Sequence, residues 1–148
     1  MAAKQVIDQA KAFLCWDTFP DLTIKLIPLE QPVAFYTPPS ANRHTITLFY
    51  PVPCDDYWPV LFLLFHEIGH YRQFQTSCTQ GKESHFWECV NMAAGEEKIE
   101  FEAESWELGK RVLSDFLSHC HSSQGTQEYA ITQYQSYAAR CLNSYEDG

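Results

Sequence analysis

The chain has 148 residues, 45% of them hydrophobic and 20% charged, which is typical of a globular domain with a buried core. Its formal net charge of −9 argues against direct binding of nucleic acid, which needs a basic surface. No apolar run approaches the roughly 20 residues that cross a bilayer, and the N-terminus lacks the apolar stretch of a signal peptide. We therefore predict a single domain over residues 1–148, cytoplasmic and without a membrane partner.

The first third of the chain alternates between helical and β patterns. Residues 3–15 carry apolar side chains at helical spacing, which predicts an amphipathic helix. Three β-rich segments follow at 21–29, 32–36 and 44–50, and the prolines and asparagine of "TPPSANR", residues 37–43, predict a loop before the last of them. These segments predict a small three-stranded sheet whose last two strands form a hairpin.

The rest of the chain is predicted to be mainly helical. A first helix over residues 57–75 begins after Asp55 or Asp56 and contains the apolar run "VLFLLF". A loop, a short helix from residue 85, a longer helix over 96–119 and a last amphipathic helix within 130–145 follow. Strands early and helices late predict the α+β class.

Six cysteines are spread along the chain without a C-x-x-C pair. In a cytosolic protein of this size they are predicted to be reduced and mostly buried. The sequence "SHCHS" around Cys120 is interpreted as a polar helix end rather than a metal site, because side chains two residues apart diverge on a helix.

The segment "LLFHEIGH" contains the candidate metal-binding and catalytic residues. His66, Glu67 and His70 form an H-E-x-x-H motif, and residues four apart on a helix lie one above the other. Both imidazoles can then bind one Zn²⁺, while Glu67 accepts a proton from a water that attacks a carbonyl. Gly69 would allow a neighbouring segment to approach closely. The plainer interpretations are two histidines with ordinary hydrogen bonds, or a purely structural metal.

A catalytic zinc usually has a third protein ligand and one open position. The candidates are the glutamates of the helix predicted over 96–119, namely Glu96, Glu97, Glu100, Glu102, Glu104 and Glu107. Helical phase places Glu102 near the centre of the apolar arc and Gly109 on the same face. A buried carboxylate is costly unless it is paired or bound to metal, so Glu102 is the predicted ligand. Most of the others fall with Lys98 on a face predicted to be solvated.

The motif "LLFHEIGH" after the strand "TITLFY", with "EFEAESWELG" downstream, resembles the ImmA/IrrE family of zinc-dependent metallopeptidases. The resemblance implies a zincin-type fold, in which a small sheet packs on the H-E-x-x-H helix. It also implies an intracellular enzyme of bacteria or phages that cuts a partner protein, such as a helix-turn-helix transcriptional repressor. Glu104 stands where the family often has Asn, so Glu100 remains a second candidate for the third ligand.

Two functions follow from these residues. The first is a zinc endopeptidase with ligands His66, His70 and Glu102 and with Glu67 as the general base. The second is a non-catalytic zincin-like module that grips a regulatory protein or senses metal; Glu67, which binds no metal, favours the enzyme. A peptide substrate is expected as an added strand along Thr45–Tyr50 unless that strand is internal. Candidates for stabilising the oxyanion are Tyr71, His85 and His119.

Overall fold

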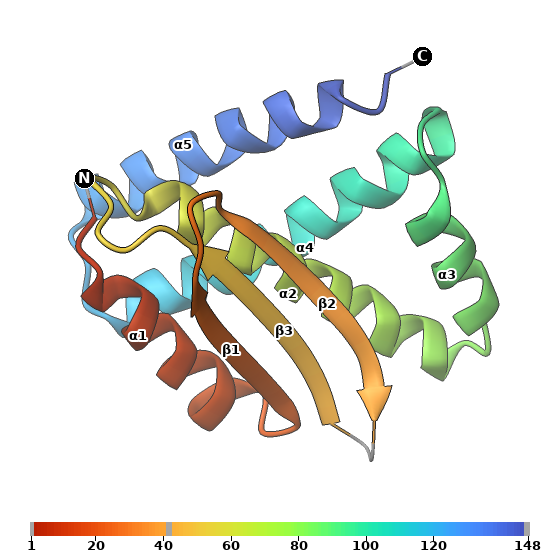
Figure 1. Cartoon of the computed structure of the whole chain (residues 1–148), viewed down its shortest axis with the longest axis horizontal. Coiled ribbons are helices and arrows are strands. Elements are labelled where there is room, and N and C mark those ends of the chain that lie inside the picture. Colours follow the sequence, from red (N-terminus) through yellow and green to blue (C-terminus); the bar gives the residue numbers. More distant parts are fainter. Residues whose placement is uncertain (1, 41–42, 147–148) are drawn as a thin grey trace. The chain divides into compact units, whose positions relative to one another are not determined.

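The computed structural model describes residues 2–40 and 43–146, and it divides into two compact units, residues 1–67 and 68–148. The boundary falls inside one continuous helix, so each unit contains part of it. The described residues form a three-stranded mixed sheet in the first unit and helices along the remainder of the chain (Figure 1). The predicted α+β class is confirmed. That the chain forms a single domain, and that the sheet packs on the motif helix as in zincins, stay predictions.

The first unit begins with helix α1, Gln5–Ala12, which continues as the π-helical segment η1, Phe13–Thr18, where one helix was predicted. Its strands are β1, Leu22–Pro28, β2, Val33–Ser40, and β3, Arg43–Tyr50. The strand order is β1-β3-β2, with β1 parallel and β2 antiparallel to β3 (Figure 1). The last two strands therefore pair as predicted.

The predicted loop over 37–43 is wrong in its first part, because β2 continues through Ser40. A register irregularity lies between Thr37 and Ser40, where the chain carries Pro38 and Pro39. β2 is an edge strand, and an edge strand with an irregular register tolerates residues that cannot donate a backbone hydrogen bond. Asn42, which was expected to help form the turn, lies outside the described residues.

Strand β3 is the central strand of the sheet. Ile46, Leu48 and Tyr50 are buried on alternate positions, and Ile46 lies opposite the buried Ile24 of β1. Both edges of β3 are paired, so Thr45–Tyr50 cannot accept a substrate as an added strand. That expectation is wrong; an added strand would have to pair with an edge strand instead.

Helix α2, Trp58–Thr79, carries the H-E-x-x-H motif. It begins as predicted after an acidic residue, because Asp56 Oδ1 accepts a hydrogen bond from the backbone N–H of Trp58 at 3.1 Å. It ends four residues later than predicted. The stop is Gly81, whose φ of +69° permits the left-handed turn in which the N–H of Lys82 donates to the carbonyl of Ser77.

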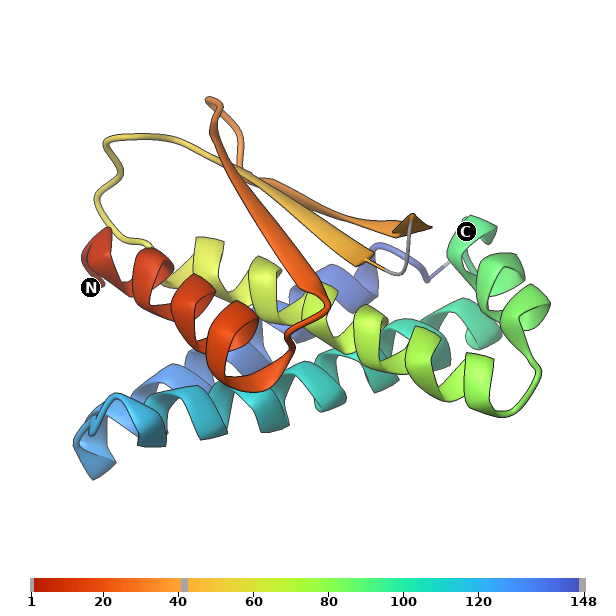
Figure 2. The same ribbon diagram turned by 90° about the horizontal axis from the view of Figure 1, so that it is seen from below.

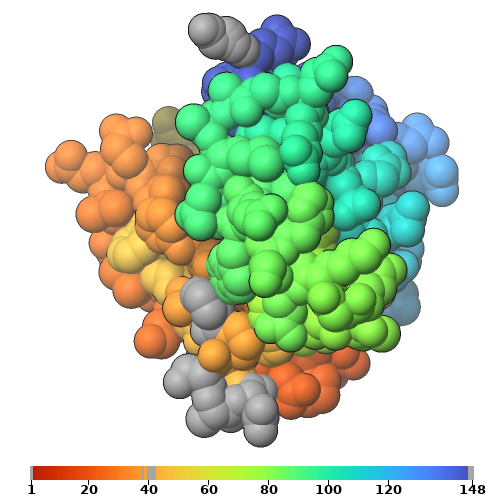
Figure 3. Space-filling view, turned by 90° about the vertical axis from the view of Figure 1, so that its right-hand side faces the viewer, coloured from red at the N-terminus to blue at the C-terminus, as the bar shows by residue number. Residues whose placement is uncertain are grey.

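The second unit adds three helices: α3, Glu83–Asn91; α4, Glu96–His119; and α5, Gln124–Asn143. Helices α4 and α5 lie side by side (Figures 1 and 2), and the hydroxyl of Tyr134 donates to the carbonyl of Trp106 at 2.7 Å. Helix α5 starts earlier than its apolar pattern indicated because Ser123 caps it. Helix α3, green in Figure 3, lies at the surface of the unit.

The cysteines are all in the described part of the chain, and none forms a disulfide. The prediction that most are buried is wrong: Cys89 is buried, whereas Cys78 and Cys120 are exposed and the others are half-buried. Helix α4 ends at His119, immediately before Cys120, in keeping with a polar helix end. Among the residues described, we find no helix with the length and apolar character that crossing a membrane requires.

Candidate metal centre

Helix α2 brings His66, Glu67 and His70 together. Each offers one ligand atom, and these atoms lie within 4.8 Å of one another, so the group could hold a metal ion. The two histidines are each 8% exposed and Glu67 is half-buried, among the mostly buried side chains of the helix. Since a buried imidazole pair in a dry surrounding is costly without partners, the contacts of these side chains decide what the group can do.

His70 is held at both ring nitrogens. Its Nδ1 lies 2.8 Å from Oε1 of Gln73, and its Nε2 lies 2.9 Å from Oε2 of Glu102. The amide nitrogen of Gln73 donates to the carbonyl of Phe101 at 2.8 Å and to Oε1 of Glu104 at 2.9 Å. Those two acceptors fix which end of the Gln73 amide faces His70, so Oε1 accepts and Nδ1 of His70 carries the proton.

The protonation at Nδ1 has a consequence for Nε2. With Nδ1–H bonded to Gln73, a neutral His70 presents a lone pair at Nε2, directly toward the carboxylate of Glu102. Two acceptors 2.9 Å apart need a proton or a cation between them: a second proton on the ring, a proton on the Glu102 carboxyl, or a shared metal ion. Nitrogen and oxygen ligands of one tetrahedral zinc ion are about 3.4 Å apart, so the two atoms, now at 2.9 Å, would have to separate by about 0.5 Å to bind one ion.

Glu102 lies where helical phase placed it. The residue is 4% exposed on α4, and its Oε1 accepts a hydrogen bond from the hydroxyl of Tyr145 at 3.0 Å. Glu100, the second candidate for this position, is exposed and lines a pocket instead. The structure therefore brings Glu102, and not Glu100, against His70.

Gly69 is what lets α2 and α4 approach so closely. A Cβ atom added at Gly69 would lie 1.9 Å from the backbone oxygen of Ser105, a separation that atoms cannot adopt. Ser105 and Gly109 are buried on the same face of α4 as Glu102. The close approach that the glycine was predicted to allow is confirmed, and its partner is the helix that carries Glu102.

Sequence reasoning missed Gln73 and assigned Glu104 to a solvated face. Glu104 is exposed, as expected, yet it accepts a hydrogen bond from the buried Gln73 and so helps to hold His70. The spacing contained one usable signal, since Gln73 follows His70 by three residues and therefore shares its helix face.

Lys98, predicted to be solvated, is buried, and its Nζ donates to the carbonyls of Cys89 and Val90.

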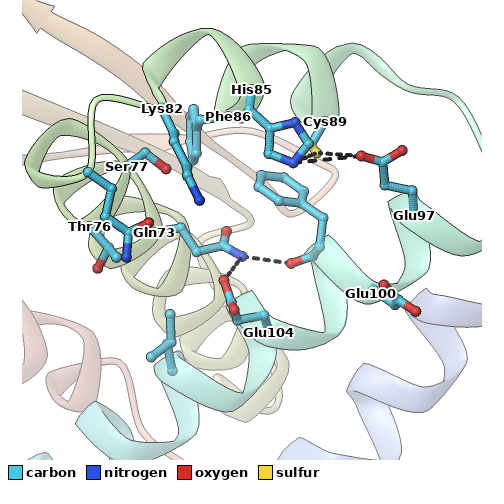
Figure 4. A pocket seen from close by; sticks show the side chains of 13 residues that line it. Gln73, Thr76, Ser77, Lys82, His85, Phe86, Cys89, Glu97, Glu100 and Glu104 are labelled. Carbon is cyan, nitrogen blue, oxygen red and sulfur yellow. Dashed lines mark hydrogen bonds and ion pairs between the residues drawn. The ribbon is translucent and has the colours of Figure 1, made fainter.

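A pocket of about 720 Å³ opens beside this hydrogen-bonded group, within the second unit (Figure 4). Gln73 from α2, Phe86 from α3 and Glu104 from α4 line it, and Figure 4 shows Gln73 and Glu104 joined by a hydrogen bond.

Among the oxyanion candidates, Tyr71 is buried and its hydroxyl accepts a hydrogen bond from Gln75 at 3.0 Å. His85 lines the pocket, and His119 ends α4.

The donor set suits a metal such as zinc: two imidazoles from α2, with a carboxylate already in contact with one of them, are ligand types that zinc accepts. Comparisons with protein families, with curated proteins and with solved structures find no match for this chain.

Proposed function

We propose that this chain is a zinc-dependent endopeptidase in which His66, His70 and Glu102 hold the metal and Glu67 is the general base. The observation that carries the proposal is the clamp on His70, whose ring is fixed by Gln73 on one nitrogen and meets the buried carboxylate of Glu102 at the other. Partners that fix the tautomer and orientation of a ligating histidine are characteristic of metal sites.

The roles of the side chains follow from their surroundings. Bound zinc would supply a Lewis acid that polarises the peptide carbonyl and acidifies a water. Glu67 neighbours both histidines and is half-buried, which suits a carboxylate that takes a proton from the attacking water and returns it to the leaving amine. Gln73 keeps the proton of His70 on Nδ1, and Tyr145 orients the carboxylate of Glu102.

The substrate is proposed to be a partner protein inside a bacterial or phage-infected cell, a helix-turn-helix repressor being the example implied by the resemblance to the ImmA/IrrE family. The acidic chain, with its formal net charge of −9, complements a basic DNA-binding protein and would itself bind no nucleic acid. Cutting such a repressor would release the genes that it silences.

The experiment compares zinc-loaded wild type with Glu67→Gln on a library of peptides from bacterial intracellular proteins, with new N-termini identified by mass spectrometry. The proposal predicts cleavages in the wild type that are absent in Glu67→Gln, although both proteins contain the same amount of zinc. Zinc in both proteins and cleavage by neither would favour the alternative, a module that grips a regulatory protein without cutting it.

A further inference from the structure

A second group of ligand-type side chains lies at the far wall of the pocket. His85 and Cys89, four residues apart on α3, meet Glu97 from the first turn of α4 (Figure 4). Figure 4 shows the imidazole, the sulfur and the carboxylate pointing toward one another. No residue of this group belongs to the H-E-x-x-H motif.

The distances within the group are those of ligands around one ion. His85 Nε2 lies 3.7 Å from Cys89 Sγ and 3.6 Å from Glu97 Oε1, and Cys89 Sγ lies 3.9 Å from the same Glu97 oxygen. Nitrogen, sulfur and oxygen ligands on a tetrahedral zinc are separated by about 3.4 to 3.6 Å. A contraction of a few tenths of an ångström would therefore place all three atoms on one ion.

We infer that His85, Cys89 and Glu97 form a second metal site, selective for zinc, with its remaining position open to water. The ligand types make this selection, because calcium and magnesium prefer oxygen ligands alone whereas thiolate and imidazole favour zinc. Cys89 is buried at the base of the group, while the side chains of His85 and Glu97 are 58% and 57% exposed and can adjust around an ion.

The surroundings of the group support a cation. Nδ1 of His85 lies 3.8 Å from the carboxylate of Glu88, too far for a hydrogen bond, so the two exposed side chains would have to approach before Glu88 could orient the ring as carboxylates do for many metal-binding histidines. Glu100 and Glu104 line the same pocket and add negative charge. Lys82, which lines the pocket, and the buried Lys98, whose charge acts on the Cys89 thiol, oppose this charge.

The backbone that carries Cys89 is already fixed on α4. The buried Lys98 Nζ donates to the carbonyls of Cys89 and Val90 at 3.0 and 3.1 Å, so the end of α3 is tied to the helix that presents Glu97. Burial, and then the Glu97 carboxylate, raise the pKa of the Cys89 thiol above its usual value, a cost that metal binding must overcome. An ion here would lock α3 onto α4 and stiffen the wall of the pocket that Gln73 and Glu104 also line.

The test uses cobalt, which replaces zinc and gives a near-ultraviolet charge-transfer band only when a thiolate binds it. The H-E-x-x-H group contains no sulfur, so the band does not report on that group, and Cys89→Ser assigns it among the cysteines. Cobalt is added to the metal-free protein, residues 1–148, in a reductant that does not bind metal, and zinc is then added in competition. We expect the band in the wild type, its loss in Cys89→Ser, and its bleaching by zinc.

The matched control is Cys120→Ser, which removes an exposed thiol just beyond the C-terminal end of α4 and should leave the band unchanged. Because Cys89 is buried, His85→Ala is the second test variant: it truncates an exposed side chain, should fold normally, and should weaken cobalt binding by about tenfold or more. A His66→Ala variant should keep the band, so loss of the peptidase centre does not affect this test.

Two results would overturn the inference. One is a folded wild type that shows no band with excess cobalt, in which case the three side chains form only weak hydrogen bonds and an ion pair. The other is a band that survives Cys89→Ser, which would assign it to another of the cysteines.

Discussion

The two groups of ligand-type side chains differ in how much of their geometry exists before any ion arrives. In the motif group, which is His66, Glu67 and His70, the ring of His70 is buried and held by Gln73 and Glu102 at 2.8 and 2.9 Å. In the outer group, which is His85, Cys89 and Glu97, the side chain of His85 is more than half exposed and its nearest carboxylates lie at 3.6 and 3.8 Å. Preorganised ligands lose less conformational entropy on binding, so the motif group should bind zinc more tightly.

The residues that contact the two histidines also differ in burial. Gln73 is 4% exposed and donates to two acceptors of its own, whereas the side chain of Glu88 is 69% exposed and contacts His85 from the next turn of the same helix. Exposed ion pairs contribute little because solvent screens them. Removing Gln73 should therefore weaken metal binding more than removing Glu88.

The largest effect is expected from Gly69→Ala. The new methyl group would clash with the backbone oxygen of Ser105, and two helices rather than one side chain would have to move. We expect a loss of about 3 kcal/mol in the free energy of unfolding, with a fall in Tm of roughly 10 °C. Calorimetry measures this. Gly125→Ala, where a Cβ meets open space, is the control and should be neutral or slightly stabilising.

Gln73→Ala should have the next largest effect. It frees Nδ1 of His70, so the ring can rotate and change tautomer, and zinc affinity at the motif group should fall by about 10- to 100-fold. Competition with a zinc-binding dye measures the affinity. Unchanged affinity would mean that Gln73 does not orient a ligand. Gln75→Ala, on an exposed residue of the same helix, should leave the affinity unaltered.

Tyr145→Phe should have a smaller effect at the same group. It removes one hydrogen bond of 3.0 Å to the carboxylate of Glu102 and leaves the ring in place. A hydrogen bond to a charged group contributes about 1.5 kcal/mol, which corresponds to roughly tenfold in zinc affinity. The same dye competition tests it, and an effect larger than that of Gln73→Ala would contradict the proposed importance of the His70 clamp.

The smallest effect is expected from Glu88→Ala at the outer group. Its carboxylate is exposed and 3.8 Å from His85, so its loss should weaken cobalt binding by no more than about fivefold. Titration of the cobalt–thiolate band measures this. A loss of 100-fold would show that the outer group is as preorganised as the motif group.

Periodicity predicted the faces of the helices but not what lies against each face. It placed Glu102 on the buried face of α4 correctly, because the apolar residues of that helix define one arc. It placed Lys98 wrongly among the solvated residues, because α3 packs against that side chain and buries it. Which helix covers a lateral face depends on tertiary packing, which the spacing within one helix does not contain.

The same limit explains the sheet and the outer group. The alternation in Thr45–Tyr50 predicts a strand but not its place in the order, and pairing with β1 and β2 makes it central. The spacing of His85 and Cys89 is compatible with metal binding, but it becomes informative only with Glu97, which arrives from another helix. The H-E-x-x-H motif was recognisable because its three residues lie within a single turn of one helix.

The zinc content of the Cys89→Ser protein, which lacks the thiolate of the outer group, tests the proposed metal centre most directly. We expect about one zinc per chain there, the same with Glu67→Gln or Glu100→Ala added, and far less with Glu102→Ala added. A Cys89→Ser protein that binds no zinc after reconstitution, or a Glu102→Ala variant that binds it as well as its parent, would contradict the proposed metal centre.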